Sequence, residues 1–521
     1  MPGKTLFRDE RKQRGAVLRV MCLALMMVVG AVASLNVALP EIARSTGASQ
    51  TQLQWIVTAY ALAFAALLLP AGAIGDRIGR KPVLAAGLGL FGLSSLAAIF
   101  ANSPGELIAL RGAMGVGAAM IMPVTLSVIT TVFPPEERGK AVGTWVGVAA
   151  GGGVLGLLAS GVMLEWLPWQ SIFVFNVVLA TIALIGTLAI VPATREARPP
   201  GIDLVGPLLS AAALAALVFG ITEGPERGWG EPTTTGALAF GVLGAVAFVL
   251  WELRRREPML DPRHFSRRGF AAGTLSITVQ FFAAFGFLFL ALPYLQLVMG
   301  YSPLQAAGAL VPMALVVIPL SRKAPAIAAR LGVRVTGAMG LSLMATGFIV
   351  LSTLELGSSY AHFLAGLLPF GAGMALAGAP ATTAIVASLP RSKQGVASAV
   401  NDVSRELGGA LGIAVLGSLM NGVYRAEMAD STANLPAGAG EQAKGSLAAA
   451  QQIGEQLGPQ GHQLVVHAQT AFLHGFTHGL IGGAAVLLLG AFFVAVRAPG
   501  RAESRSNATG KPIGAIAADG A

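Results

Sequence analysis

The chain has very little cysteine and little charge. Cys22 is its one cysteine among 521 residues, so the chain can form no disulfide within itself and no cysteine-based zinc or iron–sulfur site. Only 12% of the residues are Asp, Glu, Lys or Arg, which is too few to cover a soluble protein of this length. A Walker-type phosphate loop is also missing, so we expect no ATP hydrolysis and no bound cofactor.

Hydrophobic residues take the place of the missing charge. They make up 54% of the chain, its mean hydropathy is +0.70, and apolar segments of about 20 residues, long enough to cross a bilayer, recur along it. The first follows "MPGKTLFRDERKQRG" and is too long for a signal-peptide core, so it is expected to be retained. The predicted spans lie near residues 16–40, 52–74, 83–101, 106–130, 140–163, 169–192, 203–222, 234–252, 270–295, 303–321, 333–354, 360–386, 395–420 and 469–497.

Lysine and arginine are concentrated in alternate connecting segments. Examples are "GDRIGRK" after the second span and "RRREPMLDPRHFSRR" before the ninth. By the positive-inside rule, these segments and both termini are expected to be cytoplasmic, in a multi-pass protein of the bacterial inner membrane. The same distribution accounts for the net charge of +10, because a nucleic-acid-binding protein would gather its basic residues on one face. The expected partner is therefore the lipid bilayer and not nucleic acid.

One polar loop has a specific spacing of residue types. It reads "GAIGDRIGRKPVL", and its residues of interest are Gly72, Asp76, Arg77, Gly79, Arg80 and Lys81. Taken by itself it describes a tight turn with basic anchors, in which Asp76 caps a helix. The full spacing resembles the signature loop of the major facilitator superfamily.

Further stretches resemble the fourteen-helix drug:proton antiporter branch of that superfamily, the EmrB/QacA type. They are "LQWIVTAYALAFAALLLPAGAIGDRIGRK", "LIALRGAMGVGAAMIMP", "YLQLVMGYSPLQAAGALVPMAL" and "NDVSRELGGALGIAVLGS". The resemblance implies an all-α membrane protein with two six-helix bundles and two inserted helices, in which substrate binds near the midplane and access alternates. The predicted parts are an N-tail at 1–15, bundles at 16–192 and 270–497, inserted helices within 193–269, an external loop at 421–468 with a short helix in "GEQAKGSLAAAQQIGEQL", and a tail at 498–521.

The resemblance also implies roles for individual residues. The signature loop would act as a gate, with Arg77 or Arg80 pairing with Glu136 or Glu137 in one access state. Arg111, inside the fourth span, would take part in coupling. A structural alternative for Arg111 is that it hydrogen-bonds backbone carbonyls of a neighbouring span.

The fifth span, "GTWVGVAAGGGVLGLLASGVML", is rich in glycine. Gly147, Gly151 and Gly156 are expected to allow close packing and bending. The span stands in the place of the family's antiporter motif but departs from it, and Ala31 stands where related antiporters usually carry an aspartate. These departures favour an alternative in which proton coupling is weak or absent.

Asp402, Arg405 and Glu406 lie within about one turn of a predicted apolar helix. On the same helix, Ser404, Gly408 and Gly412 repeat every fourth residue and predict a small-residue ridge for close packing. Asp402 and Glu406 are the only carboxylates well inside any predicted span. In a low-dielectric cleft a carboxylate resists ionisation, and a nearby guanidinium opposes that effect, so movement of Arg405 or of a cationic substrate would bind and release a proton. The alternative is an internally neutralised cluster that only fixes helix packing.

Other polar residues on apolar helices are weaker candidates. His474 and His478 lie one turn apart, but two ligands do not make a metal site, so we expect interfacial histidines and no metal. Candidate cavity residues, for which an interfacial position is the alternative for the aromatics, are Asn36, Trp55, Tyr60, Gln280, Tyr294 and Gln296.

The sequence thus predicts a monomeric secondary transporter and no enzyme, because it offers no nucleophile–base pair or metal triad. Its expected partners are protons and small lipophilic or cationic substrates such as drugs or antibiotics, which it would export. The alternative is export of one endogenous metabolite, antibiotic or lipid with weak or no proton coupling.

Overall fold

The chain folds into helices throughout the part that the structure describes. This computed structural model describes residues 3–194, 203, 205–256, 258, 260–389, 394–433 and 435–500. No strand occurs among them, and fourteen helices are long and apolar enough to cross a membrane. The predicted number of spans is therefore confirmed for a multi-pass membrane protein.

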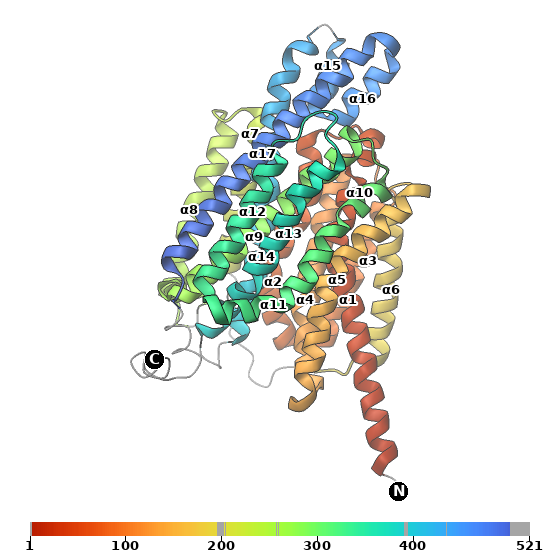
Figure 1. Cartoon of the computed structure of the whole chain (residues 1–521). Helices are drawn as coiled ribbons and strands as arrows, with labels where there is room; N and C mark the ends of the chain where they lie inside the picture. Colours follow the sequence, from red (N-terminus) through yellow and green to blue (C-terminus); the bar gives the residue numbers. More distant parts are fainter. Residues whose placement is uncertain are drawn as a thin grey trace. The chain divides into compact units, whose positions relative to one another are not determined.

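The helices divide into two compact units, and Figure 1 labels them along the chain. The first unit comprises Met1–Ala215 and Tyr301–Gly308. Its helices are α1 (Gly3–Thr46), α2 (Gln50–Ile78), α3 (Arg80–Ala98), α4 (Pro104–Val132), α5 (Pro135–Trp166) and α6 (Ser171–Ile190), with the start of α7 (Val205–Arg227) and most of α10 (Pro303–Ala309). Because α1 begins at Gly3, most of the predicted N-tail is an extension of the first helix.

The second unit comprises Ala216–Gly300 and Ala309–Ala521. It holds the rest of α7, α8 (Pro232–Arg254), η1 (Pro262–Ser266), α9 (Arg268–Pro293), η2 (Tyr294–Val298), α11 (Val311–Leu331), α12 (Val333–Leu351), α13 (Tyr360–Ala387), α14 (Gln394–Ser431), α15 (Ala437–Gly445), α16 (Leu447–Gln456), η4 (Gly458–Gly461) and α17 (His462–Arg497). The inserted helices expected within 193–269 are thus α7 and α8, of which α8 and most of α7 belong to this unit. The predicted tail at 498–521 falls almost wholly outside the described residues.

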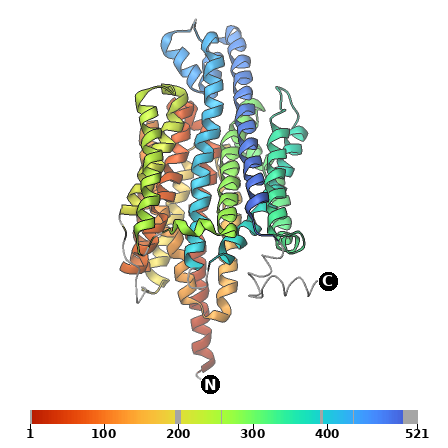
Figure 2. The same ribbon diagram turned by 90° about the vertical axis from the view of Figure 1, so that its left-hand side faces the viewer.

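The segment expected as a long loop, 421–468, is mostly helical. The helix α14 continues to Ser431, α17 begins at His462, and α15 and α16 lie between them. Figure 2 shows α14 as one long helix that leads into this helical cap. The buried Tyr424 links α14 to α15, because its hydroxyl donates to the carbonyl oxygen of Ala443 at 2.8 Å.

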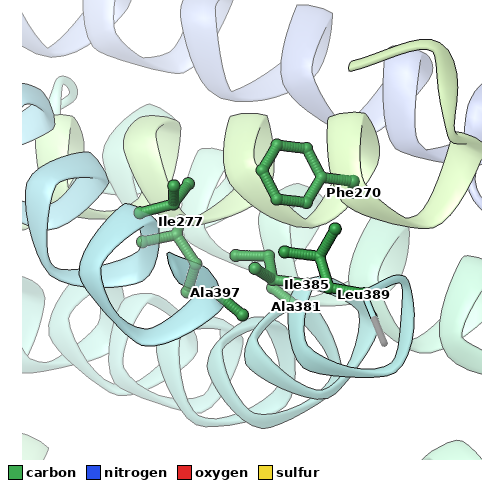
Figure 3. Packing of buried hydrophobic residues seen from close by; sticks show 7 residues of the cluster. Phe270, Ile277, Ala381, Ile385, Leu389 and Ala397 are labelled. Carbon is green, nitrogen blue, oxygen red and sulfur yellow. The ribbon is translucent and has the colours of Figure 1, made fainter. Parts of the chain in front are cut away.

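A hydrophobic cluster joins α9, α13 and α14 at one end of the second unit. Figure 3 shows its side chains, which come from Phe270, Ile277, Ala381, Ile385, Leu389, Ala397 and Val400. Each is at least nine-tenths buried. Val400 directly precedes residues 401–406 of α14, which carry most of its polar side chains in this region and are called the polar turn below. The cluster therefore helps to fix where the polar turn lies against α9 and α13.

Candidate functional site

The polar turn of α14 lies against α9. Asn401, Ser404 and Glu406 are buried, while Asp402 and Arg405 are half-buried. The turn is part of the continuous helix α14, and the Ser404 hydroxyl is satisfied within it by donating to the carbonyl oxygen of Val400 at 2.6 Å. Three ionisable groups are therefore carried on rigid backbone inside a candidate membrane span.

Glycines bring α14 into direct contact with α9. A Cβ atom at Gly408 would collide with the carbonyl oxygen of Thr278, and one at Gly412 with that of Phe282. These contacts require glycine, because any side chain would push the two backbones apart. The small-residue ridge that the sequence predicts on this helix is thus used at both positions.

Arg405 contacts an aromatic ring of α9. Its Cζ lies 5.1 Å from the centroid of the Phe281 ring, which is within the range of a cation–π interaction. The Phe281 ring packs edge-on against Phe285, with centroids 5.8 Å apart and the planes at 73°. Within the described residues the structure records no ion pair between Arg405 and either Asp402 or Glu406.

Two polar atoms of this cluster are buried without a hydrogen-bond partner among the described residues. They are Nε of Arg405 and Oε2 of Glu406. The neighbouring Asn401 accepts a bond from the hydroxyl of Thr382 on α13 at 3.1 Å. An unsatisfied buried carboxylate oxygen is costly, so this position is suited to receive a proton or a cation.

Arg111 of α4 is buried at the centre of the first unit. Its Nε donates to the carbonyl oxygen of Ile56 on α2 at 3.1 Å, and its Cζ lies 4.3 Å over the ring of Tyr60. The Tyr60 hydroxyl in turn donates to the carbonyl oxygen of Val28 on α1 at 3.1 Å. Arg111 therefore makes the backbone contact of the structural alternative, while its NH2 group keeps a free donor among the described residues.

The signature loop is a compact polar turn between α2 and α3. Arg80 donates to Oδ1 of Asp76 through Nε at 3.1 Å and through a terminal nitrogen at 3.0 Å, and also to the hydroxyl of Thr131 on α4. Gly79 has a φ of 128°, a conformation that favours glycine, and it lets the chain reverse there. Lys81 donates to the carbonyl oxygen of Leu188 at 2.8 Å, whereas Arg77 is exposed.

One detail of this loop differs from the expectation. Asp76 lies in the last turn of α2 and caps no helix, since the residue at the start of α3 is Gly79, which has no side chain. Arg80 pairs with Asp76, one helical turn away, at 3.0 Å, and Glu137 lies 3.6 Å from Nε of Arg14. The pairing of Arg77 or Arg80 with Glu136 or Glu137 in one access state stays a prediction.

Of the α5 glycines, those on one face pack closely. A Cβ at Gly156 would lie 2.6 Å from Cα of Gly30 on α1, and one at Gly152 would lie 3.4 Å from Cα of Met26. Positions Gly147 and Gly151 have open space where a Cβ would be, measured over the described residues. Close packing therefore uses Gly152 and Gly156, while the bending roles of Gly147 and Gly151 remain predictions.

The predicted cavity residues occupy different environments. Asn36 is buried and donates to Val32 at 2.9 Å, and Gln280 is buried and donates to Met374 on α13 at 2.6 Å. Tyr294 stacks on Phe476 with centroids 4.9 Å apart, so it belongs to an aromatic stack. Trp55 and Gln296 are partly exposed.

Other groups were missed or misjudged from sequence. Among the described residues no group of three or more potential ligands could hold a metal ion. Nδ1 of His474 lies 2.9 Å from Oε1 of Glu427, a residue that was predicted to lie in a loop. Glu252, at the end of α8, is fully buried and accepts a bond from the backbone of Leu260 at 3.2 Å. The burial of Glu252 was not predicted, because this residue lies at the end of a predicted span.

Comparison with known proteins places the chain in a family. A model described as the Major Facilitator Superfamily matches residues 21–413. The chain belongs to the Major Facilitator Superfamily. The predicted family and the predicted all-α, fourteen-helix fold class are thereby confirmed. Members of this superfamily are known as transporters.

Resistance and export proteins are among its relatives. The puromycin resistance protein Pur8 of Streptomyces alboniger is 36% identical over 81% of this chain and 84% of its own length. The methyl viologen resistance protein SmvA of Salmonella typhimurium is 34% identical over 87% and 92%. A bacterial homologue of the human lysosomal transporter Spinster matches in structure with a TM-score of 0.66, covering 96% of this chain and 98% of its own, at 17% identity. That structural likeness concerns the fold alone.

Proposed function

We propose that this transporter exports lipophilic cations from the bacterial cytoplasm in exchange for protons, acting as a monomer by alternating access. The observation that carries the proposal is the polar turn of α14. It holds two carboxylates and an arginine in a candidate span, and one carboxylate oxygen of Glu406 is buried without a hydrogen-bond partner in the part of the chain that the structure describes. A site of this kind exchanges a proton for a cation, because neutralising the carboxylate by either one relieves the cost of burying its charge.

The relatives support efflux as the direction of transport. They include proteins named for puromycin resistance, methyl viologen resistance and multidrug efflux. Methyl viologen is a dication, which agrees with a substrate site bearing carboxylates. The basic loops support a cytoplasmic position of both termini through the positive-inside rule.

The test uses inverted membrane vesicles that contain the protein. An imposed pH gradient, acid inside, should drive uptake of methyl viologen by wild type, and collapsing the gradient should stop it. Glu406→Gln should reduce gradient-driven uptake at least about tenfold. A tenfold change corresponds to a free energy of about 1.4 kcal/mol. Asp402→Asn should reduce it less, because Asp402 is only half-buried.

The matched control is Glu223→Gln. Glu223 is an acid of α7 that pairs with Arg227 at 2.7 Å, outside the polar turn. Uptake that is indifferent to the gradient, or that Glu406→Gln leaves unchanged, would refute proton exchange at this turn.

A second function is favoured by one sequence feature. Ala31 stands where related antiporters usually carry an aspartate, so the first unit lacks that carboxylate. In this alternative the protein exports one endogenous product with weak or no proton coupling. Uptake of that product without a pH gradient, unaffected by Glu406→Gln, would favour it.

A further inference from the structure

Arg111 and Arg405 both lie within candidate spans and over aromatic rings, but they are held differently. Arg111 is fixed, since its Nε donates to the backbone of α2. Arg405 has no such bond at Nε among the described residues, and its recorded partner is the face of Phe281. A guanidinium without a backbone hydrogen bond at Nε can leave a ring face at lower cost than one that is bonded there.

The ring beneath Arg405 is fixed in place. Phe281 lies on α9, which contacts α14 through Gly408 and Gly412, and Phe285 packs edge-on against it. Both rings are only partly buried, so the face is not sealed within the helix packing. The movable member of the pair is therefore the long arginine side chain.

The chemistry around this ring is that of a site for an organic cation. An aromatic face attracts a weakly hydrated cation, and a nearby carboxylate adds charge complementarity. Two carboxylates lie on the same helix, Asp402 three residues before Arg405 and Glu406 directly after it, and Oε2 of Glu406 is buried without a hydrogen-bond partner among the described residues. Arg405 thus occupies the place at which such a ligand would be bound best.

We propose that the Phe281 face is a subsite for a lipophilic organic cation, and that Arg405 is a tethered competitor occupying it in this conformation. The substrate's cationic group displaces the guanidinium from the ring, and the guanidinium returns when the substrate leaves. This deepens the proposed function and rests on it, because it names where a cationic substrate is recognised.

The test measures equilibrium binding of radiolabelled tetraphenylphosphonium to the purified full chain, with no pH gradient. Arg405→Gln should tighten binding, because the competitor is gone. Phe281→Leu, which keeps apolar volume but removes the ring, should weaken binding by about 2- to 30-fold, the range of a cation–π contact.

The double variant separates competition at the ring from simple charge repulsion. If Arg405 only repels cations, Arg405→Gln tightens binding equally with and without Phe281. If it competes for the ring, the gain shrinks by about 2- to 30-fold in the Phe281→Leu background. An equal gain in both backgrounds, or no gain at all, would overturn the proposal.

Controls cover misfolding and failure of transport. Arg227→Gln removes an arginine that lies 5.8 Å over Phe219, outside the polar turn, and should leave binding unchanged. If Arg405→Gln unfolds, Arg405→Met replaces it in the single and double variants, because it keeps an apolar stem without the guanidinium and should tighten binding in the same way. Because binding is measured without a gradient, vesicles that fail to take up cations would refute the proposed function separately.

Discussion

At the scale of single residues, Arg111 combines a high cost with compensating contacts. Placing a guanidinium inside a membrane helix costs about 2.5–3.5 kcal/mol. A hydrogen bond from a charged group returns about 1.5–3 kcal/mol, and a desolvated cation–π contact about 2 kcal/mol. The bond to Ile56 and the ring of Tyr60 therefore roughly offset the burial, and stability alone gives no reason to keep the arginine.

This balance predicts that Arg111→Met folds normally but does not transport. The free energy of unfolding should change by no more than about 1–2 kcal/mol, since a similar cost and gain are removed together. Gradient-driven uptake should fall at least about tenfold. Tyr60→Phe, which keeps the ring but loses the bond to Val28, is the matched control and should retain uptake. A strongly destabilised Arg111→Met that still transports would show that Arg111 only supports packing.

At the scale of helices, glycine decides which helix pairs approach closely. The α9–α14 contact at Gly408 and Gly412 leaves no room for a Cβ, and neither does the α1–α5 contact at Gly156. At Gly147 on α5 the same atom would meet open space in the described structure. Glycines at different positions of these helices therefore differ in how well they tolerate an added methyl group.

The helix contacts predict opposite results for two glycine substitutions. Gly412→Ala should destabilise the protein by about 1–3 kcal/mol, because the added methyl group overpacks the backbone of Phe282. Gly147→Ala should leave stability unchanged or raise it by about 0.5–1 kcal/mol, since it removes backbone freedom from the unfolded chain. Thermal unfolding in detergent compares the two, and equal melting temperatures would contradict the close α9–α14 contact.

At the same scale, local patterns explain what the sequence could predict. Helix number followed from apolar length, and the ridge at Gly408 and Gly412 followed from four-residue spacing. The partner of Arg405 did not, because Phe281 is distant in the chain and is one of several phenylalanines on α9. The ion pair of Arg80 with Asp76 was not predicted either, although the two residues lie only one helical turn apart.

At the scale of the whole molecule, local composition did not predict how much of segment 421–468 is helical. Its Gly- and Gln-rich composition resembles a loop, yet Tyr424 bonds to Ala443 and gives α14 a reason to continue. Tertiary contacts of this kind decide helix ends and are not visible in local composition. The positive-inside pattern, in contrast, is a property of the whole chain and needs no contact to be read.

That pattern predicts the orientation, and the single cysteine makes it testable. In a Cys22→Ser background every label must come from an introduced cysteine. Gln460→Cys on η4 and Arg256→Cys after α8 are exposed positions on opposite predicted sides. A membrane-impermeant maleimide should label Gln460→Cys in intact spheroplasts and Arg256→Cys only in inverted vesicles, because lysine- and arginine-rich segments stay in the cytoplasm. Cys22→Ser alone is the blank, and the reverse pattern would show that the termini face outward and that the protein's transport direction must be reassigned.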